Sequence, residues 1–349
     1  MKLGLVSTCS TRNLGEAAIY AALAQLAPER RVHCSLSESF PAIVRGLERN
    51  RHLDDCDAFV SAGGDGIGNA GTKPMTRRYL RMLAEMYLRR DRTFVFGQSI
   101  PASRQGISQR MLSTVLRRLA SVVVRDRKSH QILKNRGLDA GLSYDTAFVL
   151  RPQTQALEAA YGLLARHGLN PERTALISLC GASAFHDVDR DNCDRELLDI
   201  AGKLAERGHQ PAFLIQSDGS APGGERTQAM RLSRTMDNVP IVDPFAVQVP
   251  SSPCDVLIAL LSLANIVVAI RYHSAVLRLV TGRAPFVLHR SDTGSDLCDR
   301  LGLPGQRMSS GIEPGLIEAI EKSADMTFDP DPIARDVTDH FTECIKKVA

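Results

Sequence analysis

The sequence contains no tryptophan, and only 5% of its 349 residues are aromatic. Proteins that hold single-stranded nucleic acids stack the bases on exposed aromatic rings, and so few rings argue against a platform of that kind. The other proportions, 44% hydrophobic and 23% charged residues, are those of an ordinary globular protein. A chain of this length is expected to fold as two domains.

The chain also lacks a long uninterrupted apolar run. The first apolar stretch, residues 2–7, is followed at once by polar residues, whereas a secretory signal needs a longer apolar core. The longest later run, residues 256–270, is interrupted by Ser262 and Asn265 and is too short to span a bilayer. The sequence therefore predicts a cytoplasmic protein without a signal peptide or a transmembrane helix.

None of the eight cysteines belongs to a CxxC pair. This scattering argues against a zinc knuckle and against a disulfide framework, and most of the thiols are expected to be small buried hydrophobic groups. Cys180 ends a predicted strand, where a nucleophile is a second interpretation, but the sequence offers it no evident histidine partner.

Positive charge is concentrated in the first half of the chain. Residues 1–150 hold 23 Lys and Arg against 13 Asp and Glu, a net charge of +10, while the remainder has a net charge of −6. The densest part, Arg77 to Arg92, interleaves arginines with apolar residues at helical spacing. One interpretation is a solvated helix face; the other is contact with a membrane surface or an anionic, lipid-linked substrate.

The first half alternates short β-rich runs with amphipathic stretches, which predicts a largely parallel sheet covered by helices on both faces. The expected strands are LGLVS (3–7), VHCSL (32–36), AFVSA (58–62), FVFGQ (94–98) and SVVVR (121–125), and the expected helices cover 15–26, 41–49, 72–89, 107–119 and 127–136. A strand-like segment, SYDTAFVL (143–150), leads into a candidate linker at 149–155.

A second series of the same kind follows the linker. Its expected strands are ALISL (175–179), PAFLIQ (211–216), VPIVD (239–243), NIVVAI (265–270) and APFVLH (284–289), with helices at 194–207, 225–236, 253–263, 274–281, 292–301 and 332–347. The predicted fold class is α/β, with two Rossmann-like doubly wound domains, 1–150 and 151–349, facing a cleft. The last helix either stays with the second domain or packs back on the first.

Ligands of open parallel sheets bind beyond the carboxyl ends of the strands, so the residues after each apolar run are the first candidates. After the first strand, Asn13 and Gly15 begin a helix whose free backbone N–H groups suit an anion. A plain helix cap at Asn13 explains the pattern equally well. After the third strand, Gly63 and Gly64 permit close approach to a ligand and Asp65 is a hydroxyl partner, although a flexible turn is the alternative.

Two further strand ends carry arginines. In VRDRKS, Arg125 ends a strand while Asp126 and Ser129 open a helix, so the arginine is either a ligand-binding cation or half of a structural arginine–aspartate pair. In AIRYHS, Arg271 and His273 follow an apolar strand. A bidentate cation beside a group that titrates near neutrality suits phosphate or carboxylate binding combined with proton transfer, and a buried structural histidine is the alternative.

In order and spacing these motifs resemble the polysaccharide pyruvyl transferase family. The resemblance rests on NLGEAAI (13–19), AGGDG (62–66), FGQSI (96–100), VRDRKS (124–129), YDTAF (144–148) and VVAIRYHSAVLRLVTGRAPFVL (267–288). It implies a GT-B-like pair of Rossmann-like domains and a transferase of polysaccharide biosynthesis. The implied reaction moves a pyruvyl group from phosphoenolpyruvate to sugar hydroxyls of a glycan or lipid-linked saccharide, with no metal and no nucleotide cofactor.

The resemblance also implies roles for individual residues. His273 and Arg271 would be catalytic, with His273 as the general acid or the group that protonates the leaving phosphate, and Arg125 would help to bind the donor. The remaining candidate substrate-binding residues are Asn13, Gly15, Glu16, Gly63, Gly64, Asp65, Gln98, Ser99 and Arg290. The acceptor is expected on the N-terminal domain and the donor on the C-terminal domain.

The sequence departs from the family pattern at several positions. Ala17 stands in place of a second acid after Glu16, and Asp65 in place of a third glycine. Pro101 and Ala102 replace a Gly-Pro pair, and Cys180 lies where a Ser-x-Arg often ends a strand, so Arg290 or Arg283 would have to supply that cation. Two other functions therefore stay open: a GT-B glycosyltransferase that uses a nucleotide sugar, and a non-catalytic anion- or glycan-binding protein. Nucleic acid is not an expected partner.

Overall fold

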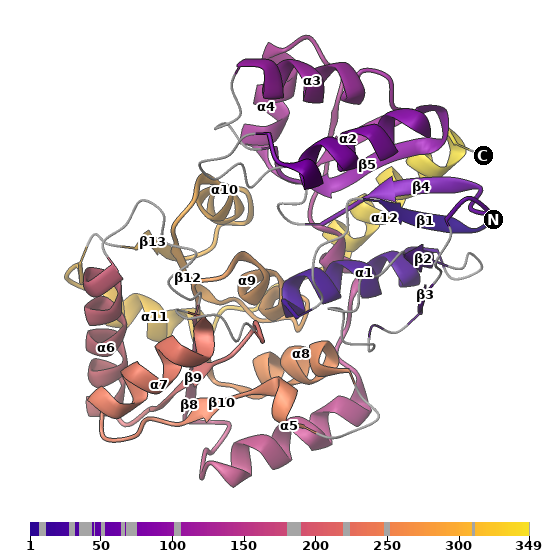
Figure 1. Ribbon diagram of the computed structural model, residues 1–349. Coiled ribbons are helices and arrows are strands. Elements are labelled where there is room, and N and C mark those ends of the chain that lie inside the picture. The colour runs from indigo at the N-terminus through magenta and orange to yellow at the C-terminus, as the bar shows by residue number, and fades with distance from the viewer. Residues whose placement is uncertain are drawn as a thin grey trace. The chain divides into compact units, whose positions relative to one another are not determined.

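The chain forms two compact units, which we describe separately from a computed structural model (Figure 1). The described residues are 1–6, 12–27, 32–34, 44, 46–49, 53–63, 67, 75–100, 106–179, 190–218, 224–247, 252–308 and 311–348. The first unit comprises Met1–Thr11, Glu16–Leu150 and Asp331–Ala349, and the second comprises Arg12–Gly15 and Arg151–Pro330. The chain thus enters the second unit at Arg151 and returns to the first at Asp331.

The first unit is built on a seven-stranded sheet in the order β3-β2-β1-β4-β5-β6-β7, with every neighbouring pair parallel. The strands are β1 Leu3–Val6, β2 Val32–Cys34, β3 Leu47–Arg49, β4 Ala58–Ser61, β5 Thr93–Gln98, β6 Ser121–Val124 and β7 Gly141–Leu142. The central strands β1, β4 and β5 are buried along their whole length, as expected for a parallel sheet covered on both faces.

Helices cover both faces of this sheet (Figure 1). They are α1 Leu14–Leu26, α2 Arg77–Leu88, α3 Gly106–Leu116, α4 Arg127–Asn135 and α12 Asp331–Lys346, with 3-10 turns η1 Arg90–Arg92 and η2 Thr146–Val149. Successive side chains of β5 point to opposite faces of the sheet. Val95 packs in the core with α2, α3 and α4 on one face. On the other face Phe94 and Phe96 make T-shaped ring contacts with Phe341 of α12.

The second unit repeats the design with six parallel strands in the order β10-β9-β8-β11-β12-β13. The strands are β8 Thr174–Ser178, β9 Gln210–Leu214, β10 Ile241–Val242, β11 Ile266–Ala269, β12 Phe286–His289 and β13 Gly305–Arg307. The helices are α5 Thr154–Arg166, α6 Arg190–Glu206, α7 Glu225–Thr235, α8 Pro253–Leu263, α9 Tyr272–Leu279, α10 Asp292–Leu301 and α11 Leu316–Ala324, and a 3-10 turn, η4, covers Pro244–Ala246.

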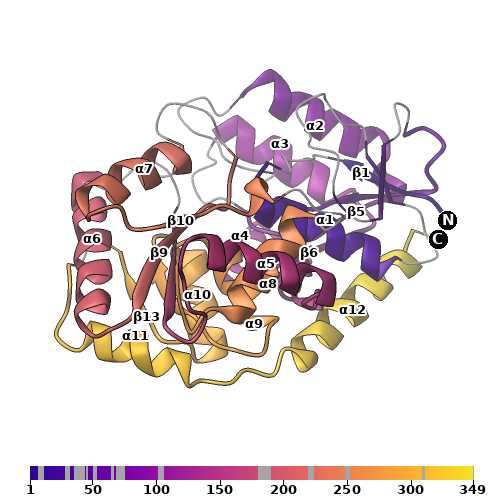
Figure 2. The ribbon, with the colours of Figure 1, turned by 90° about the horizontal axis from the view of Figure 1, so that it is seen from below.

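Two helical layers enclose the second sheet. Helices α6, α7 and α11 pack on one face, where Ile177, Phe213 and Val268 contribute to a continuous apolar core. Helices α5, α8 and α9 lie on the other face, and both layers are visible in Figures 1 and 2. The apolar helix α8 is buried along almost its whole length, since it packs against α5, α9 and η4.

Both sheets reverse their strand order at one point. The order runs outward from β1 in one direction and from β4 in the other, and it does the same from β8 and β11 in the second sheet. The predicted fold class, two Rossmann-like doubly wound domains, is confirmed. In such sheets ligands bind at the carboxyl ends of the two strands that flank the reversal. The reversals therefore mark the places to search for a site.

The structure confirms most of the expected elements and corrects two. The prediction of a helix at 41–49 is wrong for its last residues, because Leu47–Arg49 forms edge strand β3 beside β2. Gly46 has a positive φ, which is not compatible with a continuous helix. The strand-like segment 143–150 is instead the 3-10 turn η2, which Asp145 caps by accepting from the N–H of Ala147. Strands β7 and β13 and helix α11 were not expected.

One helix begins later than expected. The predicted helix at 72–89 starts at Arg77 in the structure, because Thr76 caps α2 by accepting from the backbone N–H of Tyr79. Among the helices of the described residues, none combines the length and the apolar character that crossing a membrane requires.

Candidate functional site

The carboxyl end of β11, at the strand-order reversal of the second sheet, carries Arg271. Its Nε donates to the carbonyl oxygen of Leu179 at 3.0 Å, which ties the second residue after β11 to the first residue after β8. Its Nη2 forms an ion pair with Glu225, and 21% of the Arg271 side chain is exposed. The guanidinium is thus fixed in orientation at the reversal while part of it stays accessible to solvent.

Glu225 is the acid that holds Arg271 in place. It is the first residue of α7 and is 2% exposed. One carboxylate oxygen accepts from the backbone N–H groups of Gln216, at 2.6 Å, and Ser217, at 2.8 Å, the second and third residues after β9. Burial raises the pKa of Glu225, and Arg271 and these two N–H groups oppose that rise. The carboxylate therefore links the ends of β9 and β11, and Arg271 extends the connection to the end of β8.

Two serines complete the floor of this site. Ser178 Oγ accepts from the N–H of Ile270 at 2.8 Å, which joins the ends of β8 and β11. Ser274, in the first turn of α9, donates to Oε1 of Gln216. Within the described part of the chain, Nε2 of Gln216 has no hydrogen-bond partner, although this side chain is fully buried. A buried amide nitrogen without a partner can donate a hydrogen bond to an oxygen atom of a ligand.

The segment Arg12–Gly15 belongs to this unit and lies over the end of β9. Leu14 N–H donates to the carbonyl oxygen of Gln216 at 2.9 Å, and Asp218 N–H donates to that of Arg12 at 2.8 Å. Asn13 pairs with Ser217, and its side-chain oxygen accepts from Gly15 N–H at 3.1 Å. The helix-cap interpretation of Asn13 is thus present in the structure.

Gly15 lies against His273. A Cβ atom added to Gly15 would be 2.3 Å from Nδ1 of His273, far inside van der Waals contact. The imidazole is 8% exposed and packs edge-on against the ring of Tyr272, with 5.5 Å between the ring centroids. His273 is the second residue of α9, whose N-cap is Arg271. Arg271, His273, Asn13 and Gly15 are therefore brought together at one edge.

The next strand end adds a further cation. Arg290 directly follows β12, the neighbour of β11, and is partly buried. His289, the last residue of β12, has a lowered pKa because burial and then the charge of Arg307 disfavour its protonation. Arg283, the other cation suggested by the sequence, instead donates to the carbonyl oxygens of Ala264, Asn265 and Ala324 and is structural.

In the first unit, Arg125 forms a buried ion pair. Its Nη1 lies 2.7 Å from Oδ2 of Asp145, and its Nε donates to Ser99 Oγ at 2.8 Å. Arg125 is 4% exposed and Asp145 is fully buried. The structural arginine–aspartate pair, one of the two interpretations of this arginine, is thus present, with Asp145 as the partner. Asp126 caps α4 by accepting from Ser129 N–H, as predicted.

Gln98 and Ser99 lie beside this pair. Ser99 Oγ donates to Asp126 at 2.7 Å, and Gln98 Oε1 accepts from Ser61 at the end of β4 at 3.2 Å. Gln98 is fully buried, and its Nε2 has no partner among the described residues. The candidates Gln98, Ser99 and Arg125 therefore form one network at the carboxyl ends of β4, β5 and β6.

The other candidates of the first unit are less completely placed. Gly63 follows β4 at the strand-order reversal and has a φ of 133°, a conformation that side chains rarely adopt. Glu16 lies in the first turn of α1 and is 7% exposed. Gly64, Asp65 and Cys180 lie outside the described residues.

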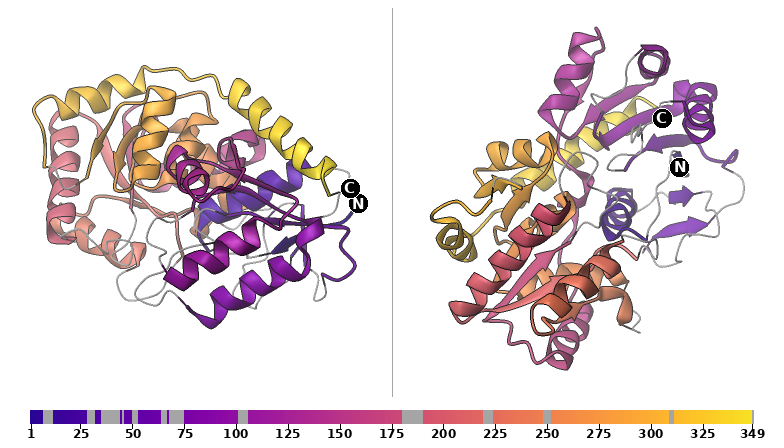
Figure 3. Two further views of the ribbon diagram at one scale, coloured as in Figure 1. Left: turned by 90° about the horizontal axis from the view of Figure 1, so that it is seen from above. Right: turned by 60° about the vertical axis from the view of Figure 1, so that its left-hand side comes forward.

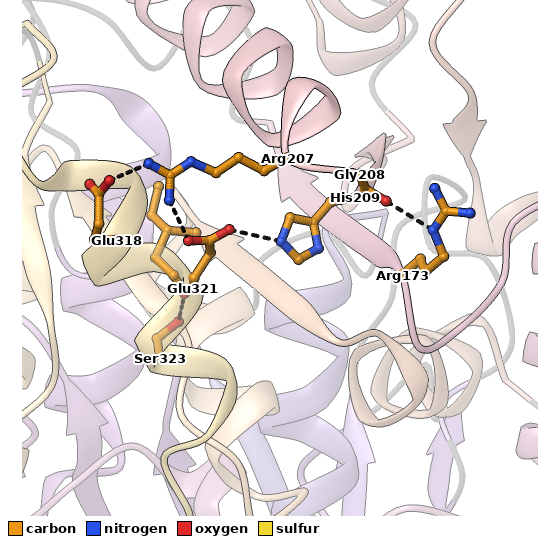
Figure 4. Close-up of polar contacts among 8 residues, drawn as sticks. Arg173, Arg207, Gly208, His209, Glu318, Glu321 and Ser323 are labelled. Carbon is orange, nitrogen blue, oxygen red and sulfur yellow. Dashed lines mark hydrogen bonds and ion pairs between the residues drawn. The ribbon is translucent and has the colours of Figure 1, made fainter.

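A second charged cluster lies at the opposite ends of the strands (Figure 4). Arg207, just after α6, pairs with Glu318 and Glu321 of α11, and Glu321 also contacts Nε2 of His209 at 3.1 Å. Because His209 comes directly before β9, the cluster faces the amino ends of the parallel strands. It ties α6 to α11 and lies away from the edge that carries Arg271.

The comparisons with known proteins agree with this geometry. Residues 13–291 match the polysaccharide pyruvyl transferase family. The chain belongs to this family. It is an enzyme of that type, and the match spans both units, from Asn13 to the residue after Arg290. None of the curated proteins compared with the sequence matches it.

Solved structures with the same fold are distant in sequence. UDP-GlcNAc 2-epimerase from Neisseria meningitidis, bound to UDP-GlcNAc, is 14% identical over 99% of this chain and 100% of that chain, with a TM-score of 0.61. The enzyme of the same name from Methanocaldococcus jannaschii is 10% identical, with coverages of 98% and 99% and a TM-score of 0.56. UDP-forming α,α-trehalose-phosphate synthase from Burkholderia xenovorans is 11% identical, with coverages of 99% and a TM-score of 0.53. At these identities the likeness shows the fold alone, which is GT-B-like.

Sequence reasoning missed several residues of the site. Glu225 is the most consequential of these, because it fixes the guanidinium of Arg271. A signal was available, since Glu225 is an acid at the start of a helix that follows a strand and a glycine-rich loop. Ser178, Gln216 and Ser274 carried no pattern that distinguishes them from other polar residues near strand ends.

Proposed function

We propose that this polysaccharide pyruvyl transferase takes its pyruvyl group from phosphoenolpyruvate and transfers it to two hydroxyls of a sugar, on a glycan or a lipid-linked saccharide, forming a ketal. One observation carries the proposal. Arg271 and His273 lie one residue apart at the strand-order reversal of the second sheet, and Glu225 and Leu179 hold the guanidinium of Arg271. A held cation beside an imidazole suits a substrate that bears phosphate and carboxylate.

The chemistry has a defined balance. A proton adds to the methylene carbon of phosphoenolpyruvate, which makes C2 electron-poor, and the first sugar hydroxyl forms a C–O bond to C2. The bond from C2 to the phosphate oxygen breaks, phosphate leaves with that oxygen, and the second hydroxyl closes the ketal. Of the two hydroxyl protons released, one balances the proton gained by the methyl group and the other leaves with the phosphate. The reaction thus needs a proton donor and a group that stabilises the departing anion.

The residues of the second unit divide these tasks. His273 is the proposed acid, either toward the methylene carbon or toward the leaving phosphate. Arg271 is the proposed anion clamp, because a guanidinium binds phosphate or carboxylate in a bidentate manner. Arg290, after the neighbouring strand, is the proposed second cation, and it would occupy the role of the arginine that the family motif places near Cys180.

The first unit is proposed to bind the acceptor. Its candidate residues are Glu16, Gly63, Gly64, Asp65, Gln98 and Ser99. The other two candidates for acceptor binding, Asn13 and Gly15, belong to the second unit, where Gly15 lies against His273. Buried Gln98 and Gln216 each keep an amide nitrogen without a partner in the described structure, which favours a role with a ligand on each unit. Donor binding by Arg125 stays a prediction, because its Nε and Nη1 are engaged by Ser99 and Asp145.

The decisive experiment is mass spectrometry of candidate glycans and lipid-linked saccharides after incubation with the enzyme and phosphoenolpyruvate. We expect a product one pyruvyl unit heavier, formed together with one phosphate. His273→Ala should lower turnover by about 10²- to 10⁴-fold, the usual contribution of a positioned acid. His167→Ala, at an exposed position in the same unit, is the matched control. Full turnover by His273→Ala would refute the proposed role of the imidazole.

The same incubations separate the other two functions. Release of a nucleoside diphosphate from an activated sugar, with no release of phosphate from phosphoenolpyruvate, would indicate a glycosyltransferase. Binding of phosphoenolpyruvate without turnover over a wide panel of acceptors would indicate a binding protein. Either result would overturn the proposed donor chemistry.

A further inference from the structure

One stretch of the first unit, residues 75–136, holds most of the unit's positive charge and contains three helices that cover one face of its sheet. Helices α2, α3 and α4 share the core that covers this face. Residues 75–136, which include them, hold 15 Lys and Arg against 3 Asp and Glu, a net charge of +12. This exceeds the net charge of +10 of residues 1–150 as a whole. The basic character of the first half thus lies in one part of one unit.

Helix α2 carries large apolar side chains on its outer side as well as on its inner side. Its inner side buries Tyr79, Met82, Leu83 and Met86 in the core. Its outer side carries both arginines and large apolar side chains, and the latter are Leu80, Tyr87 and Leu88. Leu88 is 76% exposed. A surface helix usually places charged and polar residues, not leucine, on its outer side.

Helix α3 lies beside α2 and continues the pattern (Figure 3, left). The Tyr79 hydroxyl of α2 donates to the carbonyl oxygen of Ser108 of α3 at 2.9 Å, which joins the two helices. The exposed residues of α3 and its end include Ile107, which is 67% exposed, together with Arg110 and Arg118. We call the exposed residues of α2, α3 and their flanks the basic–apolar surface.

The apolar part of this surface is concentrated rather than scattered. Nine large hydrophobic side chains are exposed among the described residues, and five of them lie here: Met75, Leu80, Tyr87, Leu88 and Ile107. Isolated exposed apolar side chains are normal, whereas a group of them on adjacent helices indicates an interaction site.

Much of the charge on this surface is not neutralised by neighbours. In the part of the chain that the structure describes, no acidic side chain pairs with Arg77, Arg110 or Arg118. Arg81 pairs with Glu85 at 2.9 Å, but 81% of the arginine side chain is exposed, so solvent screens that pair. These guanidinium groups therefore remain available to an external anion.

We propose that the basic–apolar surface docks the enzyme onto a bilayer that contains anionic phospholipids. The arginines would bind lipid phosphates while Leu80, Tyr87, Leu88 and Ile107 enter the boundary between headgroups and acyl chains. Attraction of arginines to an anionic leaflet adds to burial of apolar area, and the two together give stable, reversible binding. This inference is independent of the donor substrate.

The apolar side chains distinguish a bilayer from a soluble polyanion. An anionic polysaccharide or a nucleic acid would use the arginines but would gain nothing from Leu88 or Ile107, which project into solvent. Burial of those groups needs a partner that is apolar where it contacts them, and an anionic bilayer combines such an interior with the negative charge that the arginines require. The observations therefore favour lipid.

The test is sedimentation of the full chain with phosphatidylcholine vesicles that contain or lack phosphatidylglycerol. We expect binding to the anionic vesicles that weakens as salt rises. The variant Arg77→Gln/Arg81→Gln/Arg110→Gln/Arg118→Gln should bind at least 100-fold more weakly, at about five-fold for each arginine. Leu88→Ser/Ile107→Ser should bind about 10-fold more weakly. Matched controls in the second unit, Arg166→Gln/Arg234→Gln and Tyr161→Ser/Met230→Ser, should bind as wild type does.

The absence of tryptophan allows a second, direct measurement. Leu88→Trp introduces a single indole, whose fluorescence should shift to the blue on addition of anionic vesicles because the ring leaves water. Tyr161→Trp, at an exposed position of the second unit, should show no shift.

Three outcomes would overturn the proposal: no binding to either kind of vesicle, equal binding by the apolar variant and wild type, or an unshifted Leu88→Trp spectrum. Binding to dextran sulfate that survives Leu88→Ser/Ile107→Ser, without binding to vesicles, would identify the surface as a site for a soluble polyanion instead. Circular dichroism of each variant checks that the fold is intact.

Discussion

Gly15 and His273 approach each other so closely that no other residue fits at position 15 without moving the imidazole. A Cβ atom at Gly15 would lie 2.3 Å from Nδ1 and 2.8 Å from Cβ of His273. The Cβ atom is fixed to the backbone of α9, so rotating the ring does not relieve the clash. The glycine of the NLGEAAI motif is therefore required for a steric reason, because a side chain at this position would overlap His273.

We therefore expect Gly15→Ala to lower kcat/KM for pyruvyl transfer by about 10- to 100-fold if His273 is the proposed acid, since displacement of a catalytic group by about 1 Å has effects of this size. The measurement is the steady-state rate of phosphate release. Gly162→Ala is the matched control, because Gly162 lies within α5 and a Cβ atom there meets nothing within 4 Å. That control should keep its activity and gain about 0.5–1 kcal/mol of stability. Wild-type activity in Gly15→Ala would contradict the steric argument.

Arg271→Lys tests whether the shape of the guanidinium matters as well as its charge. A lysine ammonium cannot hold both Glu225 and the carbonyl oxygen of Leu179 while it also binds an anion in the bidentate manner of arginine. We expect KM for the proposed donor, phosphoenolpyruvate, to rise by about 10-fold or more, as the loss of one charge-assisted hydrogen bond of about 1.5–3 kcal/mol implies. Arg234→Lys, at an exposed position of α7, should leave KM unchanged.

Arg125 and Asp145 form a buried pair whose rupture should destabilise the first unit. Asp145→Asn leaves Arg125 buried without its counter-charge, and we expect a loss of about 3–5 kcal/mol in the free energy of unfolding. The double variant Arg125→Met/Asp145→Leu should lose less than Asp145→Asn, because no uncompensated charge remains. Urea unfolding followed by circular dichroism measures both. A larger loss in the double variant would show that packing, not charge, dominates at this position.

His289 should make the protein sensitive to mild acid. Its pKa in the folded state is lowered, mainly by burial, so the unfolded chain binds a proton that the folded protein does not. Stability from this residue is therefore present above pH 6.5, the ordinary value for histidine, and is lost as the pH falls through the lowered folded-state pKa. We expect His289→Gln to lose less stability than wild type between pH 8 and about 5.5. His167→Gln, at an exposed histidine, should follow wild type in the same urea series.

The sequence predicted elements whose local pattern agrees with their tertiary role. Helices α8 and α10 have the predicted bounds, because Ser252 and Ser291 occupy the N-cap positions at which the pattern begins. The prediction was wrong at Leu47–Arg49, where strand pairing with β2 rather than local propensity decides the structure. The prediction of a strand was also wrong at residues 146–149. Their apolar side chains are typical of a strand, but the Asp145 side chain accepts from the N–H of Ala147 and so makes a local turn.

In the candidate site, too, local sequence patterns could be predicted and contacts between distant residues could not. Arg271 and His273 were predictable because both stand in a short stretch after an apolar strand. Glu225 was not, because its partner Arg271 is 46 positions away in the sequence and nothing in either neighbourhood specifies that contact. Arg125 was located correctly, but its partner Asp145 follows from the packing of η2, which the sequence presented as a strand.

The way in which the chain threads the two units has a consequence for dissecting the enzyme. It crosses between them four times, at residues 11/12, 15/16, 150/151 and 330/331. A fragment comprising 151–330 would therefore lack Arg12–Gly15, which would expose the backbone acceptor of Gln216 and uncover one side of His273. A fragment ending at 150 would lack α12 and leave Phe94 and Phe96 facing water. No single cut separates this protein into two self-sufficient halves, so its units are better studied by exchanging residues within the intact chain.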